Sequence, residues 1–186
     1  MRIVKIIVCL LAMSVGTQLS AAADAEPSAT AVMFYEIVRS GDYVRAASMF
    51  DPKELGEFRD LLRIVYENPN VSDPQQIEAL FGPDITVEKL NAMSDSEFFS
   101  TFLQLIFQQL QASGSFSFDG IEVIGSVPEG DEKAHVVIRQ RLGWGENSVE
   151  MMDVISMRLI EGKWKLMMKG DMKGLAAAIR QSFQNG

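Results

Sequence analysis

The sequence is almost devoid of the residues that build disulfides, metal centres and thiolate nucleophiles. Its 186 residues contain one cysteine, Cys9, and one histidine, His135. A single cysteine excludes an internal disulfide, so the fold must be held by its hydrophobic core. One histidine without a cluster of carboxylates predicts no metal site, and we expect no cofactor. The sequence has no glycine-rich phosphate loop or calcium loop, and no G-x-S-x-G pattern precedes His135.

Basic residues are scarce relative to acidic ones. The chain has 17 Lys and Arg against 25 Asp and Glu, which gives a formal net charge of −8 at pH 7. Nucleic acids and anionic membrane surfaces attract proteins mainly through clusters of Lys and Arg. The charge balance therefore argues against both as partners.

Long hydrophobic runs are missing except at the amino terminus. Arg2 and Lys5 precede an apolar run over residues 6–13, and small residues follow at 21–25. This order is typical of a secretory signal peptide. We expect residues 1–25 to be cleaved, which removes Cys9 and leaves 15 basic and 24 acidic residues, a charge of −9. The predicted product is secreted, or periplasmic in a Gram-negative source, without membrane attachment.

The rest of the chain, residues 26–186, is predicted to form one domain that begins with helices. Caps of Asp or Ser, proline at first helical positions and apolar residues at helical spacing indicate these helices. Ser94 and Glu97 form a capping box before the most apolar helix, which we expect to lie nearly buried across a sheet. The predicted helices span residues 28–39, 42–49, 52–67, 74–80, 94–112 and 172–183.

Alternating apolar residues from residue 115 onward predict four strands near residues 115–127, 132–142, 148–160 and 163–169. A turn at residues 161–162 places Leu159 opposite Trp164, so that apolar residues share one face. Continuing the alignment places Ile138 opposite Asp153. Helices followed by an antiparallel sheet, with the helices covering its apolar face, predict an α+β domain that ends in a short helix.

This layout, with the hairpin Glu161-Gly162-Lys163-Trp164-Lys165-Leu166, resembles the nuclear transport factor 2-like superfamily. That cone-shaped fold also includes ketosteroid isomerases, scytalone dehydratases and polyketide cyclases. The resemblance covers residues 28–169 and implies a curved sheet of about four strands with the N-terminal helices on its concave face. It also implies a cavity for a small apolar ligand and dimers through the outer sheet face. No strand is predicted before Phe98, and no catalytic residue of the family enzymes carries over.

Asp153 is the main functional lead because it falls among apolar residues on one strand face. Burial of an unpaired carboxylate is costly, so Asp153 must be paired, protonated or hydrated. The predicted alignment gives it Gly170 as a neighbour and Gln140 as a diagonal polar neighbour. Two interpretations remain open. Asp153 is either a cavity acid with a raised pKa, or a carboxylate at the sheet margin that accepts from a helix terminus or a basic side chain.

Inward-facing methionines and aromatic residues complete the predicted site. Strand alternation places Met151, Met157 and Met168 on the inner face, where methionine either fills the core or contacts an apolar ligand. The predicted ligand-binding residues are Asp153, Gln140, Met151, Met157, Trp164 and Phe102.

The outer face of the sheet is predicted to be a surface. His135 falls in this outward set, opposite Ser126 and Ser156, which indicates a surface histidine. Met152 and Met167 also fall there and predict an apolar stripe that a second subunit covers, giving a homodimer.

Three functions remain open. The favoured one is an exported, non-enzymatic domain that binds a small apolar ligand or a protein partner between helices and sheet. A second is an isomerase, dehydratase or cyclase with Asp153 as general acid or base and Gln140 as hydrogen-bond donor. A third is a structural or interaction subunit with a filled core. A cavity with Asp153 on its wall favours the first two, and a salt-bridged Asp153 in a filled interior favours the third.

Overall fold

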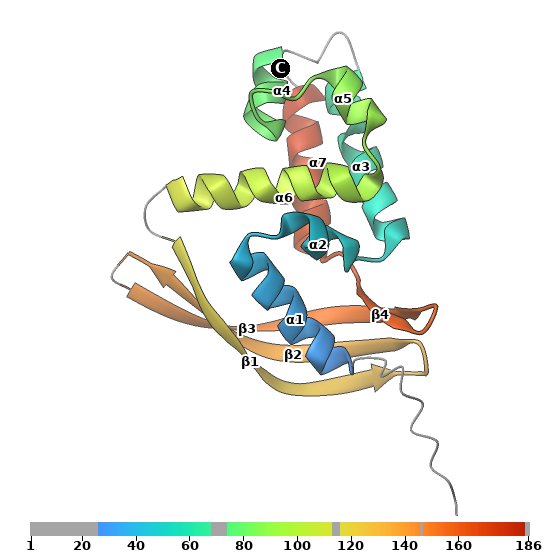
Figure 1. Cartoon of the computed structure of the whole chain (residues 1–186), viewed down its shortest axis with the longest axis vertical. Helices are drawn as coiled ribbons and strands as arrows, with labels where there is room; N and C mark the ends of the chain where they lie inside the picture. The colour runs from blue at the N-terminus through green and yellow to red at the C-terminus, as the bar shows by residue number, and fades with distance from the viewer. Residues whose placement is uncertain (1–25, 68–73, 113–115, 146, 185–186) are drawn as a thin grey trace, which may run out of the picture.

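The structure, a computed structural model, describes residues 26–67, 74–112, 116–145 and 147–184, so the predicted signal peptide lies outside the described residues. Helices precede a sheet, and a further helix ends the described chain (Figure 1). The helices are α1 (Pro27–Ser40), α2 (Tyr43–Ser48), α3 (Pro52–Glu67), α4 (Pro74–Phe81), α5 (Val87–Ala92), α6 (Asp95–Ala112) and α7 (Gly170–Gln184). The predicted α+β class is therefore confirmed.

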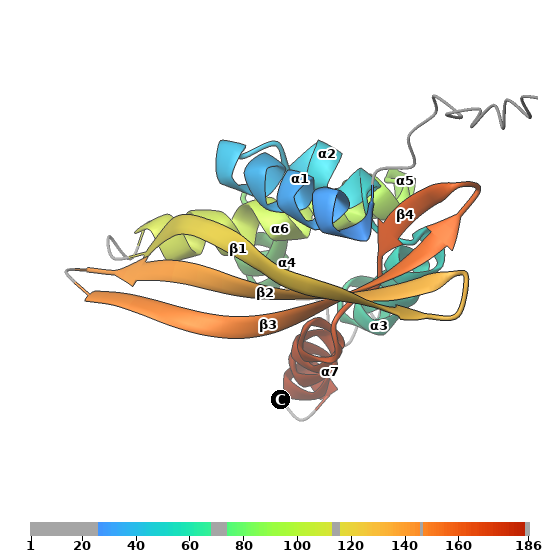
Figure 2. The ribbon, with the colours of Figure 1, turned by 90° about the horizontal axis from the view of Figure 1, so that it is seen from below.

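The strands form one open antiparallel sheet in the order β1-β2-β3-β4. Their bounds are β1 (Phe116–Glu129), β2 (Lys133–Trp144), β3 (Asn147–Ile160) and β4 (Lys163–Leu166). Ile138 lies opposite Asp153 and Leu159 opposite Trp164, as the sequence predicts. In Figure 2 the long strands curve past α1 and α2, which lie on one side of the sheet.

β4 is shorter than predicted because the chain turns away from β3 at Leu166. The N–H of Leu166 donates to the carbonyl of Met49, and the N–H of Asp51 donates to the carbonyl of Leu166, each over 2.9 Å. These two bonds tie the strand to the connection between α2 and α3. Met167 still donates to the carbonyl of Ser156 at 2.8 Å, but the pairing does not continue beyond it. Within the described chain, the outer edge of β3 before Ser156 therefore has no partner strand.

α6 differs from its predicted position across the sheet. It packs mainly against α2, α3 and α4, and Figure 1 shows it passing between α2 and the group of α4 and α5. Phe98, Phe99 and Phe102 in its first half are buried, whereas Phe107 and Leu110 in its second half are only half-buried. The helix is thus buried by other helices at one end and borders a less filled region at the other.

Two further helices depart from the sequence prediction. α5 was not predicted; Thr86 caps it by accepting a hydrogen bond from the N–H of Lys89 at 3.3 Å, and Leu90 anchors it in the core. α7 begins at Gly170, two residues before the predicted start, and packs chiefly against α3. The predicted C-terminal helix is therefore confirmed, and it packs on other helices.

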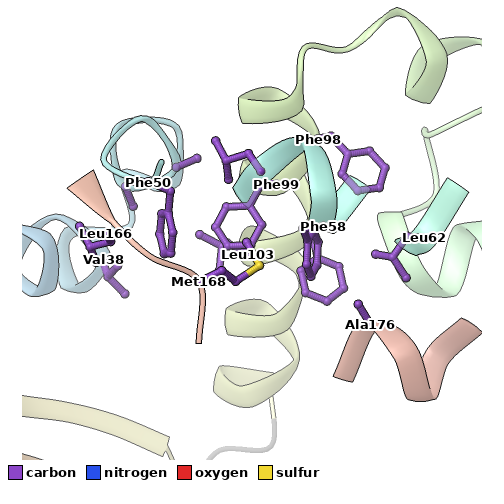
Figure 3. Close-up of a cluster of buried hydrophobic side chains, with 14 of the residues drawn as sticks. Val38, Phe50, Phe58, Leu62, Phe98, Phe99, Leu103, Leu166, Met168 and Ala176 are labelled. Atoms are coloured by element: carbon purple, nitrogen blue, oxygen red, sulfur yellow. The ribbon is translucent and has the colours of Figure 1, made fainter. Parts of the chain in front are cut away.

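The core lies where α3 and α6 meet α1, α2 and the sheet. Figure 3 shows Phe99 and Leu103 of α6 beside Phe50 and Leu166, while Phe58 lies on the other side, toward Ala176 of α7. The ring of Phe99 meets those of Phe50 and Phe58 edge-to-face, with centroids 4.9 and 5.1 Å apart. Edge-to-face aromatic packing adds to the stability gained from burial alone. This aromatic cluster fixes α6 above the sheet and so positions the cavity described next.

Candidate functional site

A half-enclosed cavity of about 270 Å³ lies between the sheet, α1 and α6. It is strongly apolar. Its aromatic lining consists of Phe34, Phe50, Phe99, Phe107 and Phe118. Its aliphatic lining includes Val38, Leu103, Leu142, Ile155, Leu166 and Met172. The cavity exists because the second half of α6 extends past the filled core and leaves the sheet beneath it incompletely covered.

Three polar residues interrupt this apolar lining, namely Tyr35, Gln140 and Lys169. Tyr35 projects from α1, and its ring stacks on that of Phe118 with centroids 5.0 Å apart. The Tyr35 hydroxyl donates to Oε1 of Gln140 over 3.4 Å, which is long for an O–H···O bond. The contact between α1 and β2 therefore places hydrogen-bonding groups in the wall of an otherwise apolar cavity.

Asp153 lies beside this polar group without lining the cavity itself. One of its carboxylate oxygens forms an ion pair with the ammonium group of Lys169. The other accepts a hydrogen bond from the backbone N–H of Val154 at 2.7 Å. Of the two interpretations drawn from the sequence, this geometry matches a carboxylate at the sheet margin that is paired with a basic side chain.

The environment of Tyr35 keeps its phenol protonated. Burial raises the pKa of Tyr35 far above its ordinary value, and the negative charge of Asp153 raises it further. A protonated phenol donates a hydrogen bond at any physiological pH. Tyr35 is therefore a fixed donor at the cavity wall.

The six predicted ligand-binding residues fall in different places. Gln140 lines the cavity. Asp153 does not line it, but it forms an ion pair with Lys169, which does. Phe102 and Met157 are buried in the core, and Trp164 is half-buried against it. Met151 is exposed. The structure thus brings Gln140 and Asp153 together near the cavity and leaves the other four outside its lining.

Two methionines lie in surroundings that the sequence does not predict. Met151 lies on the helix-facing side of β3, as predicted, but its side chain is exposed because none of the described helices covers that end of the strand. The sequence predicts that Met167 points outward, yet in the structure it lines the cavity. The reason is that β4 ends at Leu166, so strand alternation no longer governs the residues that follow.

Tyr35 and Lys169 are the polar site residues that the sequence does not predict, and most of the apolar lining is absent from the predicted set as well. Tyr35 falls within the helix predicted over residues 28–39, but nothing in the sequence indicates a contact between it and Gln140. The sequence predicts Lys169 at the end of the last strand, with Gly170 as the neighbour of Asp153. Because the chain leaves the sheet early, Lys169 reaches Asp153 instead.

His135 lies half-buried on the outer face of the sheet, away from the cavity. Its Nδ1 is 2.9 Å from Oγ of Ser156, as the predicted alignment of β2 with β3 suggests. Its Nε2 is 2.7 Å from a carboxylate oxygen of Glu129. On β1 its partner is Val127 and not the predicted Ser126, because an irregularity after Val123 shifts the register by one residue. No group of three or more His, Cys, Asp or Glu suited to a metal ion occurs in the described residues.

The outer face carries the exposed apolar side chains of Met152 and Val154 on β3. Charged pairs lie beside them, with Arg139 bonded to Glu122 and Arg141 bonded to Glu150. Dimerisation through this mixed surface stays a prediction.

Comparison of the sequence with models of known protein families gave no match, and comparison with curated proteins gave none either. The nuclear transport factor 2-like resemblance, which rests on the element order and on the hairpin at residues 161–166, therefore stays a prediction. Over the part of the chain that the structure describes, no helix is both long and apolar enough to span a membrane.

Proposed function

We propose that this protein is a non-enzymatic, exported binding domain whose cavity holds a small apolar ligand. The observation that carries the proposal is the cavity of about 270 Å³, whose lining is apolar except for Tyr35, Gln140 and Lys169. Sites for small molecules combine a mainly apolar lining with a few placed polar groups. The cavity follows that pattern.

The position of the cavity supports the same function. It borders the filled aromatic core around Phe99 on one side and the half-buried residues Phe107 and Leu110 on the other. A rigid core next to a less covered margin supplies a fixed binding surface together with a route for entry. Its size lies near the lower end of the range for drug-sized ligands, about 300–1,000 Å³. A small ligand, or one end of a longer one, fits this volume.

The enzymatic alternative has less support. Asp153 does not line the cavity, and its carboxylate is engaged by Lys169 and by the N–H of Val154. A general acid or base must reach the proton that it transfers. Binding therefore accounts for more of the observed geometry than turnover does.

A saturable binding assay tests the proposal. We expect the environment-sensitive apolar dye N-phenylnaphthylamine to bind the folded protein with a single-site isotherm. Native mass spectrometry of protein purified from its own source should detect a retained apolar molecule. Linear, non-saturating dye fluorescence together with an empty protein would contradict the proposed function.

A pair of variants locates the binding. Leu142→Trp adds bulk to the floor of the cavity on β2 and should abolish dye binding. Val154→Trp adds the same indole to the outer face of β3, where the side chain is exposed, and should leave binding unchanged. Equal affinity of the two variants would show that the dye binds elsewhere.

A further inference from the structure

The cavity presents hydrogen-bond donors without presenting a net charge. Lys169 is the one charged residue among the described residues that line it, and Asp153 neutralises its ammonium group. The side chains of Lys169 and Asp153 are 32% and 23% exposed, so water screens the pair only in part. A ligand that approaches this wall therefore meets an ion pair and not a free cation.

Two donors are placed to meet a neutral acceptor on the ligand. The Tyr35 hydroxyl makes only a long bond of 3.4 Å to Oε1 of Gln140. The amide nitrogen of Gln140 makes no hydrogen bond to any of the described residues. An acceptor atom placed between them would gain a bond from the hydroxyl and another from the amide N–H. Both donors come from residues that line the cavity, so a ligand with such an atom would bind more favourably than one without it.

The apolar surface continues out of the cavity along β3. Gln140 and Leu142 of the cavity floor lie opposite Met151 and Val149 in the antiparallel ladder. Directly opposed residues share one face of a sheet, so Met151 and Val149 extend the floor. They are 48% and 49% exposed, which is unusual for side chains on the helix-facing side of this sheet. The result is an apolar track that starts at Tyr35 and Gln140 and leads toward the edge of β3.

We propose that the ligand is an uncharged, elongated, lipid-like molecule that carries one hydrogen-bond acceptor, such as an ester or ketone carbonyl. This inference rests on the proposed binding function. The acceptor lies at Tyr35 and Gln140, and the chain runs over Met151 and Val149. The occupied volume thus exceeds the cavity itself.

Charged amphiphiles of the same length fit less well. A carboxylate that binds Lys169 must displace Asp153 or lie close to its negative charge. An ammonium group that binds Asp153 must likewise displace Lys169. Either exchange leaves one partly buried charge without its partner, and that loss is costly. A neutral carbonyl requires neither exchange.

The test compares three ligands with similar chains, namely methyl decanoate, decanoate and decylammonium, at pH 7 and below their micellar concentrations. Each competes with N-phenylnaphthylamine for the wild-type protein. We expect the ester to bind at least about tenfold more tightly than either ion, because only the ions disturb the pair of Asp153 and Lys169. A carboxylate or an amine that binds as tightly as the ester would overturn the inference.

Two charge variants assign the selectivity to this ion pair. Asp153→Asn leaves Lys169 unpaired and should remove most of the tenfold preference for the ester over decanoate. Lys169→Met leaves Asp153 unpaired and should bring decylammonium to the affinity of the ester. If one variant does not fold, the other still tests whether the ion pair causes the selectivity. Unchanged selectivity in a folded variant would refute the role of the pair.

A third comparison tests the apolar track. Met151→Glu places a charge on the track and should weaken the binding of methyl decanoate more than that of methyl butyrate. Met152→Glu places the same charge on the opposite face of β3 and should affect neither ester. Equal effects of the two variants on methyl decanoate would refute the track. Absence of saturable dye binding to the wild type would instead count against the proposed function itself, so the two failures are distinguishable.

Discussion

Asp153 forms an ion pair with Lys169 at the point where β3 loses its outer neighbour. The same carboxylate accepts a hydrogen bond from the N–H of Val154 at 2.7 Å. The N–H of Val154 points toward the open edge, since the carbonyl of Ser156, two residues later, accepts from Met167 on that side. The Asp153 carboxylate therefore covers the N–H of Val154 at the edge that β4 leaves vacant. Natural sheets often protect such edges with inward-pointing charges, which answers why an apolar strand face carries an acid.

This relationship predicts that Asp153→Val increases self-association. The valine frees the N–H of Val154 and extends the exposed apolar run that includes Met151 and Met152. An uncharged, apolar strand edge is a template for pairing with another chain. Light scattering after size-exclusion chromatography should show a larger fraction of higher-mass species than in the wild type at the same concentration.

The matched control is Asp131→Val in the exposed turn between β1 and β2, which removes the same charge far from the edge. It should leave the association state as in the wild type. If both variants associate equally, the effect comes from net charge, and the role of Asp153 at the edge is wrong.

Tyr35 predicts a loss of stability at alkaline pH. Burial, and secondly the charge of Asp153, raises the pKa of Tyr35 in the folded state above its unfolded value. The stabilising contribution of the protonated phenol is therefore fully present below the unfolded pKa of about 10, and is lost as the pH rises through the higher folded value. The free energy of unfolding from urea titrations should decline above about pH 10.

Substitution separates Tyr35 from the other tyrosines. Tyr35→Phe should flatten this alkaline decline, because the variant has no phenol at this position to ionise. Burial also raises the pKa of Tyr43, but no neighbouring charge adds to the effect, so Tyr43→Phe should change the decline less. An identical alkaline profile for wild type and Tyr35→Phe would contradict the environment described for Tyr35.

The strand alignment was predictable because apolar and polar residues alternate along the strands, and the described helices cover one face of the sheet. Once residues 161–162 form the turn, a shift by one residue would move Met157 and Ile155 out of the core, so only one register buries both. The alignment of Ile138 with Asp153 follows from it. On β1 the prediction for His135 was off by one residue, since a bulge interrupts the alternation and leaves no clear signal in the sequence.

The cavity wall was less predictable because it depends on contacts between distant segments. Tyr35 and Gln140 are 105 residues apart in the chain, and their hydrogen bond follows from the docking of α1 on the sheet. Lys169 reaches Asp153 only because Leu166 is tied to Met49 and Asp51, which draws the chain off β3. Local periodicity carries no information on either event. The sequence could therefore indicate a covered sheet face, but not the polar group at its margin.

The capping box before α6 predicts that Ser94→Ala lowers the free energy of unfolding by a measurable amount. The Ser94 hydroxyl accepts from the N–H of Glu97 at 3.3 Å, so that the alanine leaves this helical N–H without its cap. Removal of a serine N-cap costs about 1 kcal/mol of folding free energy. Urea denaturation should report a loss of this size, and Ser126→Ala on an exposed part of β1 should cause little change.

Ser94→Ala should also change how the free energy of unfolding depends on pH in the acid range. Hydrogen bonds from Ser94, first the hydroxyl and then the backbone N–H, lower the pKa of Glu97. This contribution is present above the unfolded pKa and is lost as the pH falls through the lower folded value. Ser94→Ala should therefore differ from the wild type most near neutral pH and least at acid pH. A constant difference across this range would argue against the coupling of the two residues.

The most buried acid of the described chain, Asp51, predicts the largest electrostatic effect of a single substitution. Its carboxylate is 3% exposed, lies 2.5 Å from a guanidinium nitrogen of Arg158 and accepts from the N–H of Lys53 at 2.9 Å. It thereby joins the start of α3 to β3. Arg158→Met keeps much of the side-chain volume but leaves the carboxylate with a backbone donor alone. We expect a loss of about 2–3 kcal/mol in the free energy of unfolding, measured by urea denaturation.

Arg139→Met on the neighbouring strand is the matched control, because Arg139 pairs with Glu122 where both side chains are exposed. Exposed ion pairs contribute about 0–1 kcal/mol, so this variant should stay close to the wild type. The comparison cancels the general effect of replacing arginine by methionine on a strand, and the remaining difference reports the burial of Asp51. Equal losses for the two variants would mean that water reaches Asp51 as freely as Glu122, which is incompatible with the junction of α3 and β3 described above.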